Sequence, residues 1–184
     1  MTYWDPLPAL AALPADSPYA DVRWDGRWEE RNWRNVPGPF YGAATDTCWT
    51  GRLHAPESVL YDPEYGLEYV YRQPRDPGEI ESLREAACEE AYGGYGYDGD
   101  LYWTPDAVRA WWRDRGRVRE DAFSLGWGEW ATIGREALQD LAAGARAYVA
   151  HIDGDLNGYL RGYLFRLQEG RAAHPGERLP ELRP

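Results

Sequence analysis

The sequence contains no lysine, so all 20 of its basic residues are arginines. This absence excludes reactions that need a lysine amine as Schiff-base former or general base. Two cysteines, Cys48 and Cys88, and three histidines are present. Iron–sulfur ligation needs more than two cysteines from one chain, and these scattered histidines and cysteines lack the spacing of a zinc site. We therefore expect no metal and no cofactor.

Long apolar runs are also missing, since no window approaches the roughly 18 apolar residues of a membrane-spanning helix. Pro6, Pro8 and Pro14 interrupt the Leu/Ala segment 7–13, so this segment lacks the charged start and the continuous apolar run of a signal peptide. We expect a cytoplasmic protein with free thiols. The net charge of −11 disfavours anionic lipid and direct nucleic-acid contact.

The negative charge is concentrated in the first hundred residues. Residues 51–100 contain 12 carboxylates and 4 arginines, a net charge of −8, whereas residues 101–184 contain 12 of each. We expect the block from Arg52 to Asp100 to form one continuous acidic face. Such a face indicates a basic protein partner, because opposite charge accelerates encounter.

The first half of the chain has strand and turn signals. An Asp-Gly pair at Asp25-Gly26 between short strand-like runs predicts a hairpin over 22–29. A second hairpin is predicted from 58–61 to 67–72, because the connecting segment 62–66 contains Pro and Gly. These runs predict a small antiparallel sheet.

The second half reads as helical. Asp76-Pro77 and Thr104-Pro105 are helix start signals, the first for a helix reaching about Tyr92 and the second for one reaching Arg115, with possible resumption after Gly116. Apolar residues at helical spacing continue over 133–167, either as one helix or as a helical hairpin broken at 153–155. The prediction is a single α+β domain over residues 1–172, with an N-terminal antiparallel sheet packed by C-terminal helices, and a disordered tail over 173–184.

Two small motifs bear on whether the chain has a catalytic or a metal-binding site. Cys48 with His54 suggests a thiol nucleophile and its base, but Asp46 beside Cys48 does not favour the thiolate. The segment Asp153-x-Asp155-x-Asn157 resembles the start of a calcium loop, yet the twelfth position is Leu164 instead of the bidentate glutamate. We therefore predict no catalytic and no metal-binding residue from these motifs.

The candidate partner-binding residues lie on the helix that begins near Asp76 and in the Tyr/Gly-rich segment after it. On the helix, three glutamates recur every fourth residue, a spacing that costs a few tenths of a kcal/mol per pair. An arginine stripe at 109, 113 and 117 on the next helix is the alternative partner for these glutamates. The predicted partner-binding residues are Glu81, Glu85, Glu89, Glu90, Tyr95, Tyr97, Asp98, Asp100, Tyr102 and Trp103.

The stretches 33–42 (Trp-Arg-Asn-Val-Pro-Gly-Pro-Phe-Tyr-Gly), 46–52 (Asp-Thr-Cys-Trp-Thr-Gly-Arg), 68–74 and 103–105 resemble a group of uncharacterised small acidic actinobacterial proteins. The resemblance covers roughly residues 22–120. It brings no catalytic motif and implies a lineage-specific accessory protein.

Three function classes fit these observations. The leading hypothesis is an immunity- or antitoxin-like inhibitor that binds a basic toxin domain, such as a nuclease or a deaminase. The alternatives are a small carboxylate-dependent hydrolase with an aromatic cleft, for which Asp98 and Asp100 are candidates, and a nucleic-acid mimic. An enzyme would show a pocket with convergent polar groups of perturbed pKa.

Overall fold

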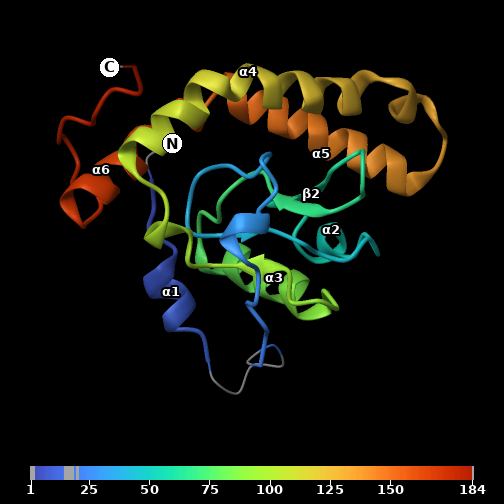
Figure 1. Ribbon diagram of the computed structural model, residues 1–184, viewed down its shortest axis with the longest axis horizontal. Coiled ribbons are helices and arrows are strands. Elements are labelled where there is room, and N and C mark those ends of the chain that lie inside the picture. Colours follow the sequence, from blue (N-terminus) through green and yellow to red (C-terminus); the bar gives the residue numbers. More distant parts are fainter. Residues whose placement is uncertain (1–2, 15–18, 20, 184) are drawn as a thin grey trace. The chain divides into compact units, whose positions relative to one another are not determined.

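The computed structural model describes residues 3–14, 19 and 21–183. The chain forms two compact units, where the sequence analysis expects one domain over residues 1–172. The first unit is Asp5–Tyr102, and the second contains the chain from Trp103 onward together with Tyr3 and Trp4. Figure 1 shows the strands in the first unit and the three longest helices of the second. Within the described ranges, no helix is both long and apolar enough to cross a membrane.

The first unit combines short helices with two small sheets. Its sheets are antiparallel pairs, β1 with β4 and β2 with β3, which confirms the predicted α+β class. In chain order its elements are α1 (Leu7–Ala11), the 3₁₀ helix η1 (Trp28–Glu30), β1 (Tyr41–Gly42), α2 (Gly51–His54), β2 (Val59–Tyr61), β3 (Glu68–Val70), α3 (Pro77–Glu89), β4 (Tyr95–Gly96) and the 3₁₀ helix η2 (Gly99–Leu101).

The hairpin predicted over 58–72 is confirmed as β2 and β3. Its turn is fixed by the Asp62 carboxylate, which accepts hydrogen bonds from the backbone N–H groups of Glu64 and Tyr65 at 3.0 and 2.7 Å. Gly66 has a φ of 74°, a left-handed conformation that favours glycine. Both sides of the two strands are buried, so the hairpin lies inside its unit.

The hairpin predicted over 22–29 is wrong. Asp25 and Gly26 donate their backbone N–H groups to the carbonyls of Gly93 and Tyr95, at 2.9 and 3.0 Å. A Cβ atom at Gly26 would lie 2.6 Å from the Tyr95 carbonyl carbon, so glycine is required here for close backbone approach. The backbone N–H groups of Asp25 and Gly26 therefore bind a distant segment and do not form a local hairpin turn.

Two buried amides hold the irregular segment between η1 and β1. Asn35 accepts hydrogen bonds from the N–H groups of Gly42 and Val70 and donates to the carbonyls of Asn32 and Gly42, over 2.6–2.9 Å. Gln73 donates to the Val36 and Phe40 carbonyls and accepts from the Phe40 N–H. Asn35 and Gln73 therefore support the backbone of this irregular segment.

Helix α3 begins as predicted, with the Asp76 side chain accepting the Glu79 N–H at 3.0 Å. It ends at Glu89, three residues before the predicted end near Tyr92. The buried Glu90 carboxylate ends the helix, because it accepts hydrogen bonds from the N–H groups of Asp46, Tyr92 and Gly94. The last of these donors is 2.5 Å from the carboxylate.

The second unit is helical: α4 (Pro105–Trp127), the 3₁₀ helix η3 (Glu129–Thr132), α5 (Glu136–Asp153) and α6 (Leu156–Glu169). The Thr104 hydroxyl accepts the Ala107 N–H and starts α4, which continues through Gly116 for 23 residues. Of the two alternatives for residues 133–167, one helix or a helical hairpin, the structure has two helices, with the break at Gly154. Helices α4 and α5 pack against each other, as Figure 1 shows.

Both ends of the chain contribute to the second unit. Tyr3 is buried, and its ring lies 5.7 and 5.5 Å from those of Tyr159 and Tyr163 on α6. Residues 173–183, where the sequence analysis expects disorder, contact α4 and α6. Leu182 is 2% exposed, and Arg161 donates to the carbonyls of the segment 179–180.

Candidate functional site

Helix α3 presents three glutamates away from its buried side. Ile80, Leu83 and Ala87 are buried, whereas Glu81 and Glu89 are exposed and Glu85 is half-buried. This separation follows from the helical period, because residues four apart lie on one face. We call Glu81, Glu85 and Glu89 the acidic strip.

Only the middle glutamate of the acidic strip has a partner among the described residues of its unit. Glu85 accepts a short hydrogen bond from the Tyr19 hydroxyl, and its other oxygen lies 3.5 Å from Nδ1 of His54. This hydrogen bond and burial raise the pKa of Tyr19. Among the described residues of this unit, the side chains of Glu81 and Glu89 make no ion pair and no hydrogen bond.

Two large apolar side chains flank the acidic strip. Leu53 on α2, next to His54, is 78% exposed, and Tyr92, just after α3, is 68% exposed. Helix α2 contacts α3, so Leu53 and the acidic strip belong to neighbouring elements. Exposed apolar groups beside unpaired carboxylates are the combination that a partner with basic and apolar contacts would bind.

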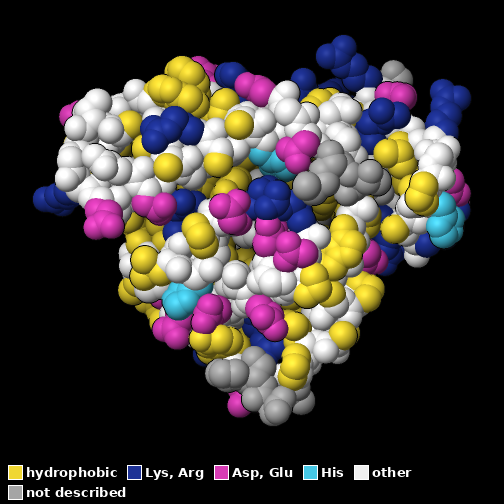
Figure 2. Space-filling model, turned by 180° about the vertical axis from the view of Figure 1, so that it is seen from behind, with side chains coloured by type: hydrophobic (Ala, Val, Ile, Leu, Met, Phe, Trp, Pro, Cys, Tyr) yellow, Lys and Arg dark blue, Asp and Glu magenta, His cyan; other side chains and the backbone are white. Residues whose placement is uncertain are grey.

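The continuous acidic face expected from Arg52 to Asp100 is wrong. Asp62, Glu68 and Glu90 are buried and serve the fold. A further pair of carboxylates is neutralised on the surface, since Arg72 lies 2.6 Å from Glu57 and Arg75 pairs with Glu79. On the face drawn in Figure 2, acidic side chains lie interspersed with arginine and hydrophobic ones.

Tyr95 and Glu68 form a buried pair below the surface. The Tyr95 hydroxyl donates to Oε2 of Glu68 at 2.5 Å, and the Gly51 N–H donates to Oε1 at 2.9 Å. Burial raises the pKa of Glu68 to about 7, against these two hydrogen bonds, and nearby Asp46 and Glu90 raise it further. Burial also raises the pKa of Tyr95 well above its ordinary value. Because Glu68 is 0% exposed, this pair has no access to a substrate in this conformation.

The remaining predicted residues are spread over different surroundings. The Asp98 carboxylate accepts the Tyr41 hydroxyl at 2.7 Å, and burial together with this bond raises the pKa of Tyr41. Tyr102 stacks on Trp28, with ring centroids 5.0 Å apart. Among the others, Tyr97 is exposed, Asp100 is half-buried on η2, and Trp103 is buried in the second unit. The structure thus keeps Glu81, Glu85 and Glu89 together but does not gather the ten predicted residues into one surface.

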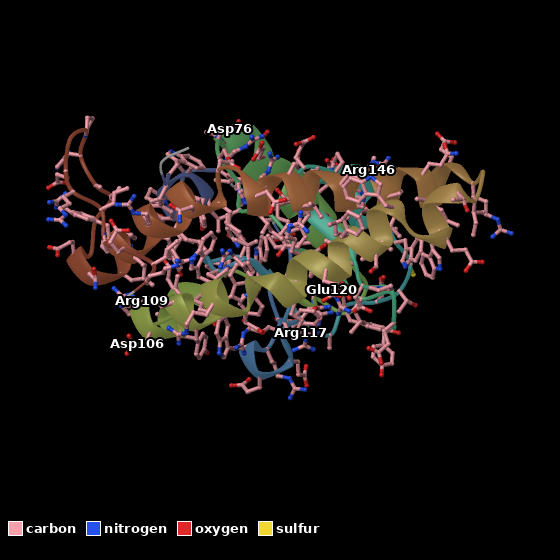
Figure 3. The ribbon with its side chains drawn as sticks, turned by 90° about the horizontal axis from the view of Figure 1, so that it is seen from above. Asp76, Asp106, Arg109, Arg117, Glu120 and Arg146 are labelled. Carbon is pink, nitrogen blue, oxygen red and sulfur yellow. The ribbon has the colours of Figure 1, made fainter. Side chains whose placement is uncertain are left out.

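The arginine stripe lies on α4, in the second unit. Figure 3 shows Asp106 and Arg109 near the start of this helix and Arg117 and Glu120 further along it. Nη1 of Arg109 lies 3.5 Å from Asp106, and its Nε donates to the Glu181 carbonyl at 3.3 Å. Arg109 therefore has partners within its own unit.

The carboxylates of the two small motifs contact other groups of the protein. Cys48 is exposed, and the charge of Asp46, which accepts the Cys48 N–H at 2.8 Å, raises the pKa of the thiol. A raised pKa lowers the thiolate fraction at neutral pH. In the calcium-like segment, Asp153 pairs with Arg119 at 2.7 Å, and Asp155 lies 2.6 Å from Nδ1 of His151.

An aromatic group at the end of α4 is absent from the sequence-based predictions. Phe123 and Trp127 are exposed and stack with centroids 4.8 Å apart, and Trp130 and Ile133 are exposed nearby in the chain. Arg146 donates to the Gly126 carbonyl at 2.7 Å and reaches the Trp127 ring. The four-residue spacing of Phe123 and Trp127 on a predicted helix was the signal that could have found the stacked pair.

No protein-family model, curated protein or solved structure matches this chain. The interpretation of the surface therefore depends on its own geometry and charge.

Proposed function

We propose that the chain is an acidic protein-binding module that acts as an immunity- or antitoxin-like inhibitor of a basic nuclease or deaminase domain. The observation that carries the proposal is the acidic strip, with Glu81 and Glu89 exposed and unpaired within the described part of their unit. Enzymes that act on nucleic acids bind their substrate through cationic surfaces. A rigid row of carboxylates is complementary to such a surface.

The helix supports this role because it holds the three carboxylates in a fixed row. Its own arginine, Arg84, is buried, so no exposed basic side chain of α3 interrupts the strip. Leu53 and Tyr92 supply the apolar contacts, which determine the rate of dissociation, whereas the exposed carboxylates determine the rate of association.

The test uses a basic nuclease or deaminase domain, which the proposal expects to be encoded beside this gene, immobilised for surface-binding kinetics. In the double variant Glu81→Gln/Glu89→Gln, we expect association at low ionic strength to slow by about three- to tenfold, and the difference to vanish at high salt. Tyr92→Ala should raise the dissociation rate by about 30-fold, equivalent to about 2 kcal/mol.

The matched control is Glu120→Gln/Glu169→Gln, which removes two exposed charges from the second unit. It has the same net charge as the α3 double variant, so it separates local complementarity from total charge. Equal slowing by both double variants would contradict a role for the acidic strip. Absence of binding by the unmodified chain at every salt concentration would reject the inhibitor proposal for that partner.

A further inference from the structure

The Asp5–Tyr102 unit contains a pocket of about 390 Å³, and Arg84 of α3 is one of its lining residues. Eight of its nine lining residues are aliphatic or aromatic, and they come from α1, the residues just after it, the segment 22–24 and Tyr97. Trp24 forms a fixed part of the wall, because its ring contacts those of Phe40 and Tyr97 with centroids 5.7 and 5.6 Å apart. This volume lies within the range of small-molecule sites.

Arg84 is the single charged residue in the lining. It is 6% exposed, and its Nε donates to the Tyr19 carbonyl at 2.6 Å. Its Nη2 is also buried, and among the described residues this atom has no hydrogen-bond partner. The neighbouring Glu85 carboxylate is engaged by Tyr19 and His54 instead. A buried guanidinium nitrogen without an acceptor is costly, and a bound anion would remove that cost.

The chemistry of the lining selects the ligand class. Arginine presents a planar fork of donors that matches a carboxylate. The apolar wall cannot satisfy a sugar or a second charged group, because its side chains offer few polar partners. A ligand with one carboxylate and an apolar body fits both parts of the site.

We propose that this pocket binds a small apolar monocarboxylate. The carboxylate pairs with Arg84, taking the place of the missing acceptor at Nη2, and the apolar body lies against Leu10, Leu13 and Trp24. Because Nη2 of Arg84 is buried, the carboxylate reaches it only when the side chains around it move slightly apart. The pocket contains no residue of the acidic strip, but the two share a neighbour, because the Tyr19 carbonyl accepts the Arg84 Nε–H and the Tyr19 hydroxyl donates to Glu85.

The test compares octanoate, octanol and octyltrimethylammonium at pH 7.5, below their micelle concentrations, by isothermal titration and by tryptophan fluorescence. These probes have the same apolar chain and differ in the charge of the head group. We expect octanoate to bind at one site, at least about tenfold more tightly than octanol, because a hydrogen bond to a charged group contributes about 1.5–3 kcal/mol. Octyltrimethylammonium should show no saturable binding.

Two variants locate the binding. Arg84→Gln should lower the affinity for octanoate by about tenfold or more and leave that for octanol unchanged. The control Arg23→Gln removes an exposed arginine of the same unit, which forms an ion pair with Asp25 at 2.7 Å, and this variant should bind octanoate normally. Should Arg84→Gln fail to fold, the shift of the Arg84 side-chain nitrogen signals on titrating octanoate into the unmodified chain replaces it.

Three results would overturn the proposal. They are equal affinity for octanoate and octanol, octanoate binding by Arg84→Gln as tight as by Arg23→Gln, and absence of saturable octanoate binding. In the spectroscopic version, unchanged Arg84 nitrogen signals at saturating octanoate would have the same meaning.

Discussion

Replacing Glu68 by glutamine should change how the stability of the protein depends on pH. The carboxyl group has an ordinary pKa of 4.5, and in the folded protein burial raises this pKa to about 7. Between these values the folded protein keeps a proton that the unfolded chain has released. The unfolding free energy therefore falls as pH rises through this window, and it levels off above it.

The magnitude follows from the width of the window. About 2.5 pH units at about 1.4 kcal/mol each correspond to about 3.5 kcal/mol of stability lost between pH 4.5 and 7. Glutamine keeps the shape of Glu68 and can still accept the Gly51 N–H, but it does not ionise. The stability of the unmodified chain minus that of Glu68→Gln should fall by about 3.5 kcal/mol from pH 4.5 to 8.

Urea unfolding followed by tryptophan fluorescence at several pH values measures this difference. If more than one unfolding transition is seen, the free energy is taken from the transition whose midpoint changes in Glu68→Gln. Carboxyl-carbon NMR titration provides a control that needs no unfolding, and it should give a midpoint near pH 7 for Glu68. A stability difference that stays constant within about 1 kcal/mol over the whole range would refute the reasoning.

Two further predictions concern Asn35 and Cys48. Asn35→Ala removes the partners of buried backbone groups at Asn32, Gly42 and Val70 and should lower the unfolding free energy by about 3 kcal/mol; the exposed Asn157→Ala is the control in the same urea assay, and equal small losses would contradict the bracing role. The Cys48 thiol, whose pKa the charge of Asp46 raises, should react with iodoacetamide more slowly at pH 8 than a cysteine in an unstructured peptide. Mass-spectrometric rates at several pH values test this, and a faster rate would contradict it.

The elements that could be predicted are those whose signals are local. Asp62 and Gly66 specify the turn between β2 and β3, and Asp76 specifies the start of α3, because each acts on backbone groups within a few residues. The exposure of Glu81 and Glu89 was equally predictable, since the apolar residues of α3 determine which side of the helix is buried.

The remaining features depend on contacts between distant segments. Glu90 follows Glu89 in sequence, yet it is buried because its carboxylate binds the backbone at Asp46 and ends the helix. Asp25-Gly26 has a strong turn signal, but its N–H groups pair with the segment 93–95. Tyr95 is hidden because its hydroxyl reaches Glu68. One sequence without structural neighbours does not reveal such pairings.

The burial of Tyr3 on α6 has a consequence for the order in which the protein folds during synthesis. Tyr3 leaves the ribosome before every residue of α6, but its binding surface includes Gly162, where a Cβ atom would lie 2.5 Å from that of Tyr3. The residues of the Asp5–Tyr102 unit are synthesised before α6, so this unit can fold first, whereas Tyr3 can pack only after α6 has been made. The packing of the second unit is therefore completed by a residue that is synthesised before the Asp5–Tyr102 unit, and a fragment beginning at Trp103 would leave the Tyr159 and Tyr163 rings without Tyr3, which covers them.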